Sequence, residues 1–123
     1  MVWLAFLQIV IGIIAIEFPS FKYLVYAHVF LGLVILGLAH YNNLQIKKTE
    51  APSRLKRIVK STAGLATLQI ILGAVVFVNV LGVGVPFVGV ISILHLMVAL
   101  AIITQASSVA TAYDMWEDKE YTK

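Results

Sequence analysis

Residues 61–81 read STAGLATLQIILGAVVFVNVL, a stretch of 21 residues without a charged side chain. A helix needs roughly 20 mainly apolar residues to cross the hydrocarbon core of a bilayer. Three further stretches are also mainly apolar, at residues 2–18, 21–41 and 86–111. The sequence therefore predicts an all-α membrane protein, a bundle of four transmembrane helices that forms a single domain over residues 1–123.

The composition of the whole chain supports a membrane protein. Of its 123 residues, 61% are hydrophobic and only 12% are charged, about half the charged fraction of an ordinary soluble domain. The chain has no cysteine, which excludes disulfides, thiolate metal sites and a thiol nucleophile. The first apolar stretch lacks a basic leading segment and a small-residue cleavage pattern, so we expect a retained helix rather than a signal peptide.

The connection predicted at residues 42–60 sets the expected orientation. It contains one acidic residue, Glu50, and six basic residues: Lys47, Lys48, Arg54, Lys56, Arg57 and Lys60. Basic loops stay on the cytoplasmic side of a membrane. We therefore expect a multi-pass protein of the cell membrane with both termini in the cytoplasm and both short connections outside. Binding of anionic lipid or nucleic acid is an alternative use of these charges, but topology explains them, and no nucleic-acid partner is expected.

The four apolar stretches form two similar halves. In each half a Gln-x-x-x-Gly motif on the first helix is followed by a histidine on the second, with a small residue four positions later. The corresponding pairs are Gln8 with Gly12, Gln69 with Gly73, His28 with Gly32, and His95 with Ala99. Two matches in register indicate two parallel repeats of a helix pair, related by an axis along the membrane normal.

The two repeated histidines are the leading candidates for a functional site, because ionisable residues inside a membrane are costly and usually functional. At about 1.5 Å per residue, His28 lies roughly 10 Å and His95 roughly 14 Å from the outer ends of their helices. Two imidazoles at one depth suit the axial positions of a haem iron. Gly32 and Ala99, one turn further, would leave room for a porphyrin edge. Alternatively, each histidine makes only an interhelical hydrogen bond.

Other polar residues have less specific interpretations. Gln8 and Gln69 could hold a haem propionate or a ligand histidine, or could tie helices together where Gly12 and Gly73 permit close approach. His40 has no counterpart in the second repeat and is interpreted as an interfacial residue. A zinc site is less favoured, because no third ligand is expected at the level of the histidines.

The pattern resembles one half of the haem A synthase family, membrane enzymes that oxidise a methyl group of haem O. The residues that carry this resemblance are Gln8, Gly12, His28, Gln69, Gly73 and His95, which it implies as haem-binding positions. That family also has a Glu three residues before the first histidine and an Arg directly after it. Here those positions are Val25 and Val29, so no catalytic residue is predicted and enzymatic activity stays open.

Three functions follow as hypotheses. The first is a membrane haem-binding protein similar to haem A synthase, an oxidoreductase if active, with haem of b, o or a type held by His28 and His95 near the outer face. The second is a b-type cytochrome, an electron-transfer subunit of a respiratory complex with quinol or another subunit as partner. The third is a haem-free scaffold or assembly subunit. A homo-oligomer could imitate the two halves of the full-length family.

Overall fold

The computed structural model describes residues 1–122, which form four α-helices: α1 (Val2–Glu17), α2 (Lys22–Ile46), α3 (Ser53–Val80) and α4 (Val88–Tyr121). No strand occurs in this described part of the chain. The prediction of an all-helical bundle is confirmed. Three of the helices, α2, α3 and α4, are long and apolar enough to cross a membrane, whereas α1 is apolar but shorter.

The apolar surface of these helices faces outward. Only 11% of the most apolar stretch of each of α2, α3 and α4 is buried inside the protein. Large side chains such as Phe30, Ile71 and Ile93 are exposed. Because exposed apolar area of this extent is unfavourable in water, the structure is that of a helical membrane protein.

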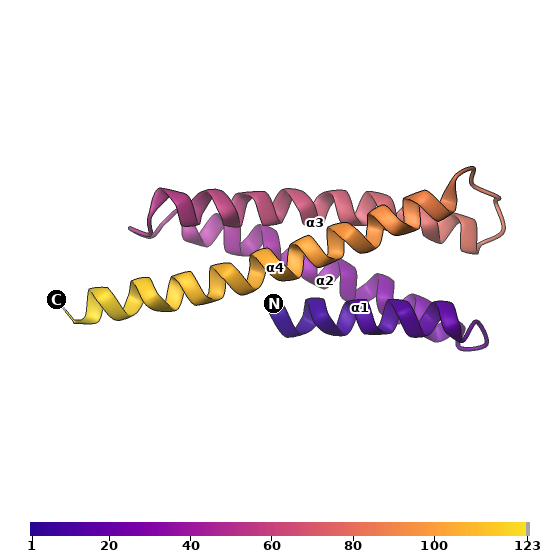
Figure 1. Ribbon diagram of the computed structural model, residues 1–123, viewed down its shortest axis with the longest axis horizontal. Coiled ribbons are helices and arrows are strands. Elements are labelled where there is room, and N and C mark those ends of the chain that lie inside the picture. The colour runs from indigo at the N-terminus through magenta and orange to yellow at the C-terminus, as the bar shows by residue number, and fades with distance from the viewer. Residues whose placement is uncertain (123) are drawn as a thin grey trace.

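The helices pack in a closed ring in which α1 contacts α2, α2 contacts α3, α3 contacts α4, and α4 contacts α1. Consequently α2 and α4 are diagonal to each other. Figure 1 shows the tight α1–α2 and α3–α4 connections at one end of the bundle and the α2–α3 connection at the other. We call α1–α2 the first hairpin and α3–α4 the second hairpin. The two hairpins diverge toward the end with the tight connections (Figure 1).

The predicted helix limits were wrong where the chain leaves the apolar stretches. Helix α2 continues to Ile46 and α3 begins at Ser53, so the predicted loop 42–60 shrinks to residues 47–52. Helix α4 continues to Tyr121 rather than ending at 111. The charged residues in the extensions of α3 and α4, mainly Lys, Arg and Glu, are good helix formers, and the short extension of α2 is polar but uncharged. Loss of apolar character therefore marks the expected membrane boundary and not the end of the helix.

The start of α4 also differs from the prediction. The predicted helix 86–111 was expected to begin at Pro86, but α4 begins at Val88. The preceding segment contains three residues with positive φ, Gly82 at 91°, Gly84 at 72° and Phe87 at 56°. Left-handed backbone cannot continue a right-handed helix, so α4 starts only after Phe87. Helix α1 ends at Glu17, one residue earlier than predicted.

Small residues form the central packing layer. Ala39 of α2, Ala63 and Ala66 of α3, and Ile102 of α4 form one buried cluster. Small side chains let helix backbones approach closely, which is how membrane helices gain van der Waals contact. This layer separates the two ends of the bundle.

Candidate functional site: a histidine pair between diagonal helices

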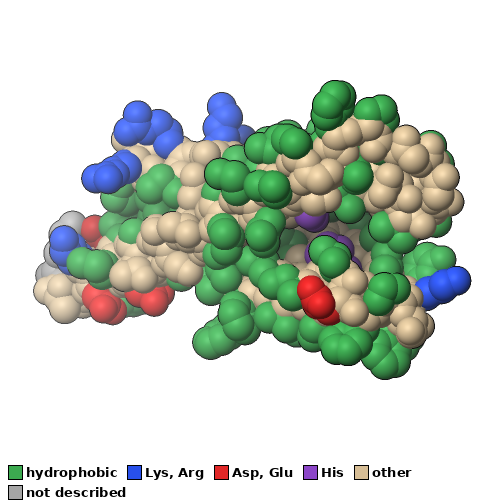
Figure 2. Space-filling view, turned by 45° about the vertical axis from the view of Figure 1, so that its right-hand side comes forward, with side chains coloured by type: hydrophobic (Ala, Val, Ile, Leu, Met, Phe, Trp, Pro, Cys, Tyr) green, Lys and Arg blue, Asp and Glu red, His purple; other side chains and the backbone are tan. Residues whose placement is uncertain are grey.

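The two repeated histidines lie side by side at the end of the bundle with the tight connections. The imidazole centroids of His28 and His95 are 6.1 Å apart, and the ring planes meet at 68°. Both side chains are half-buried. Figure 2 shows histidine side chains at the bottom of a hollow bordered by hydrophobic side chains. Since α2 and α4 are diagonal in the ring, the pair joins the two repeats across the bundle.

The first repeat holds His28 through a reciprocal pair of hydrogen bonds. The side-chain amide of Gln8 donates from Nε2 to the main-chain oxygen of His28 at 2.8 Å. In return, Nδ1 of His28 lies 3.0 Å from the main-chain oxygen of Gln8. A carbonyl oxygen only accepts, so Nδ1 carries the proton and donates. This contact sets the tautomer and leaves Nε2 of His28 without a proton, as a metal ligand requires.

A glycine makes room for each imidazole. A Cβ atom added at Gly12 would lie 2.8 Å from Cε1 of His28, and one added at Gly73 would lie 3.0 Å from Cε1 of His95. Both distances are shorter than van der Waals contact, so a side chain at either position would displace the ring. The glycine of each Gln-x-x-x-Gly motif thus leaves the space that the imidazole of the same repeat occupies.

The second repeat holds its histidine less firmly. Nε2 of His95 lies 3.5 Å from Nε2 of Gln69, a long contact. Within residues 1–122, Nδ1 of His95 is buried without a hydrogen-bond partner, and the same is true of Oε1 of Gln69 and Oε1 of Gln8. Buried polar atoms normally have partners. This group of unpaired atoms beside the histidines indicates a place for a polar or metal-containing ligand.

The space beside Gly32, one turn beyond His28, is already occupied. A Cβ at Gly32 would lie 3.0 Å from Nε2 of Gln8 and 3.5 Å from Cδ1 of Ile70. Gly32 therefore makes room for the Gln8 amide, where the sequence predicted open space for a ligand edge. Ala99 lies one turn beyond His95 and is half-buried.

The remaining ionisable residues lie apart from the pair. His40 is exposed on α2, and its Nε2 is 3.0 Å from Oγ1 of Thr67 on α3. Glu17 is exposed at the end of α1. Within residues 1–122, no group of three or more His, Cys, Asp or Glu side chains is placed to hold a metal ion. A metal at the His28–His95 pair would therefore take only two ligands from the protein, as a haem iron does.

The separation of the two ring centroids is compatible in length with one metal ion between two opposed imidazoles. A metal–imidazole bond is about 2.0 Å, so with a ring radius of roughly 1.1 Å the centroids of two opposed ligands lie about 6 Å apart. The observed separation is 6.1 Å. The 68° angle between the rings does not hinder this arrangement, because each imidazole can rotate independently about its own metal–nitrogen bond.

Sequence reasoning did not find a second hollow at the opposite end of the bundle. Its lining includes Met1 on the N-terminal side of α1, Asn42 on α2 and Tyr113 on α4. No motif links these residues, and their proximity depends on how the four helices diverge.

Comparison of the chain with protein-family models, curated proteins and solved structures finds no match, so the function is inferred from the two sites themselves.

Proposed function

We propose that the chain is a membrane haem protein in which His28 and His95 are the axial ligands of one iron. The observation that carries this proposal is the pair of imidazoles from diagonal helices, 6.1 Å apart, each seated against a repeat glycine. Bound haem supplies one-electron chemistry at its iron, and the residues around it position the ligands and exclude water.

Electron transfer is the activity that this site supports best. A haem held by both His28 and His95 would have no free position on its iron for oxygen, which suits electron transfer. Val25 and Val29 flank His28, so these positions supply neither a carboxylate for proton transfer nor a guanidinium for a haem propionate. Oxidation of a haem methyl group, as in haem A synthase, is the second candidate, favoured by the repeated arrangement of Gln, Gly and His.

The pigment of the purified protein tests both candidates. After expression in cells that make haem B and haem O, we expect a Soret band and sharp α and β bands on reduction with dithionite, as two-histidine haem gives. Extraction of the pigment should yield unmodified haem. Recovery of haem A-type pigment would favour the synthase instead. A colourless protein that also fails to take up added haemin would refute the haem proposal.

We also propose that the basic α2–α3 connection is cytoplasmic, which places the histidine pair in the outer half of the membrane. Because the chain has no cysteine, single cysteines report the orientation without background. In intact cells, a membrane-impermeant maleimide should label Ser20→Cys, between α1 and α2, and should label Ser53→Cys only after lysis. Labelling in the reverse order would contradict this orientation.

A further inference from the structure

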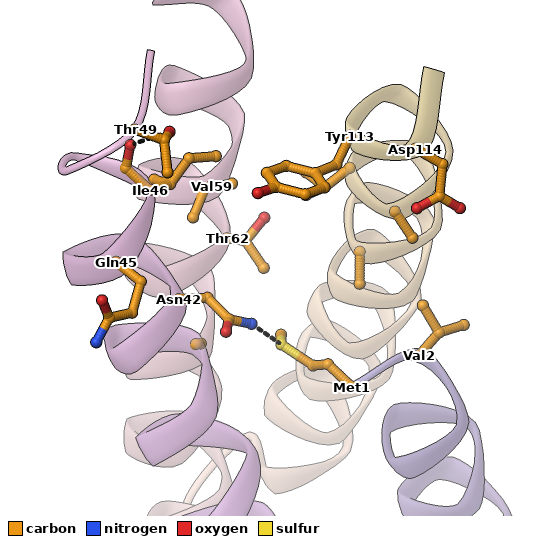
Figure 3. Close-up of a pocket in the computed structure, with 14 residues that line it drawn as sticks. Met1, Val2, Asn42, Gln45, Ile46, Thr49, Val59, Thr62, Tyr113 and Asp114 are labelled. Atoms are coloured by element: carbon orange, nitrogen blue, oxygen red, sulfur yellow. Dashed lines mark hydrogen bonds between the residues drawn. The ribbon is translucent and has the colours of Figure 1, made fainter. Parts of the chain in front are cut away.

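The hollow at the α2–α3 end of the bundle has the size and lining of a ligand site. Its volume is about 400 Å³, within the range of roughly 300–1,000 Å³ that small-molecule sites occupy. Helices α2, α3 and α4 continue past the first turn of α1, and the cavity lies between them there (Figure 3). The layer of small residues around Ala39 and Ala63 separates it from the histidine pair.

Most of the wall is apolar. The apolar lining residues include Met1, Ala39, Val59, Ala106 and Ala110. Ala106 and Ala110 are one helical turn apart and therefore lie on the same face of α4. Their small side chains leave space beside α4 that a planar ring could occupy. The aromatic ring of Tyr113, another lining residue, continues the same side of the cavity.

Two hydrogen-bond donors at the cavity have no strong acceptor. Figure 3 shows the Tyr113 ring extending from α4 toward Thr62, with its hydroxyl leading. That hydroxyl has no hydrogen-bond partner within residues 1–122. Asn42 donates from Nδ2 to Sδ of Met1 at 3.7 Å, and a thioether is a weak acceptor. By contrast, the hydroxyl of Thr62 is already bonded to the Ile58 carbonyl and to Gln105, each at 2.9 Å.

The charge of the lining argues against an anionic ligand. Asp114 is the one charged side chain among the lining residues that the structure describes. The basic residues of the α2–α3 region do not line the cavity, although they are close in sequence. The N-terminal ammonium of Met1, another lining residue, balances the Asp114 carboxylate, so the lining carries no net charge with which to hold an anionic head group. The lining fits a neutral molecule with acceptor oxygens and an apolar body.

We propose that this cavity binds a neutral, ring-bearing amphiphile of the quinone class. Its carbonyl oxygens accept hydrogen bonds from Tyr113 and Asn42, its ring lies against the alanine face of α4, and its apolar chain follows the apolar wall. This inference does not depend on haem binding, because the cavity residues are separate from the histidine pair.

Tryptophan fluorescence provides a direct test on the full chain. Trp116 packs against Tyr113 with ring centroids 5.3 Å apart, and quinones quench indole fluorescence at short range. The other tryptophan is Trp3, so a Trp3→Phe background leaves Trp116 as the one reporter. Titration with decylubiquinone in detergent micelles should quench Trp116 saturably. Quenching that rises linearly, as for simple partition into the micelle, would overturn the proposal.

Two variants in this background locate the ligand. Tyr113→Phe keeps the ring beside Trp116 but removes the donor, so we expect about five-fold weaker binding, the worth of one neutral hydrogen bond. Ala110→Phe fills the cavity and should abolish saturable quenching. Ala112→Phe adds the same ring to a face of α4 outside this lining and should leave binding unchanged. Equal quenching in all variants, or displacement of the quinone by oleate at similar concentration, would refute the proposal.

Discussion

Replacing His28 with alanine is expected to weaken haem binding strongly, whereas replacing His95 should leave a haem that is held more firmly, with an open axial position. The two histidines differ because His28 is oriented by the main-chain oxygen of Gln8 at 3.0 Å, while Nδ1 of His95 has no partner within the described residues. A hydrogen bond to the other ring nitrogen of a ligating histidine changes metal affinity by about 10–100-fold. We therefore expect haem to dissociate at least about ten times faster from His28→Ala than from His95→Ala.

Transfer of haem to apomyoglobin measures these dissociation rates. Binding of carbon monoxide to the reduced protein reports the open axial position, which His95→Ala should show and which added imidazole should close. His40→Ala is the matched control, because His40 bonds to Thr67 and should not affect the spectrum. Circular dichroism would show that each variant remains helical. Equal dissociation from His28→Ala and His95→Ala would contradict the asymmetry, and unchanged spectra in both would contradict the haem site itself.

Gly12→Ala is expected to destabilise the protein and to disturb the histidine pair with a single methyl group. The new Cβ would lie 2.8 Å from Cε1 of His28, and the ring cannot move away without losing its bond to Gln8. Overpacking of this kind costs about 1–3 kcal/mol. The expected result is a lower unfolding midpoint in detergent together with a weaker or shifted Soret band.

Gly64→Ala is the matched control for this variant. Gly64 lies within α3, and a Cβ there would meet no atom within 4 Å. Alanine in an unobstructed helix interior is more favourable than glycine by roughly 0.5–1 kcal/mol. Gly64→Ala should therefore keep or raise stability and leave the pigment unchanged. If both variants behaved alike, the close contact at Gly12 would not be the cause of the effect.

Much of the candidate site follows from local sequence pattern. The apolar stretches predict the helices because the length of a membrane span is set by the bilayer. The repeated Gln-x-x-x-Gly motifs and histidines single out His28 and His95 because both halves carry the same residues at the same spacing. The helix ends were predicted less well, since α2 continues through the polar residues Asn42 and Asn43, and α3 begins in a Lys- and Arg-containing segment that the hydropathy pattern assigns to a loop.

The membrane-spanning helices, the two repeats and the choice of histidines are thus determined by the sequence itself, because composition and spacing are local properties. The tertiary structure alone decided that α2 and α4 are diagonal, and that the two imidazoles meet 6.1 Å apart. It also decided that Gly32 receives the Gln8 amide, that His28 is held more firmly than His95, and that a cavity forms beside Tyr113. These features depend on how four helices cross and diverge, which is set by the joint packing of small side chains such as Ala39, Ala63 and Ala66.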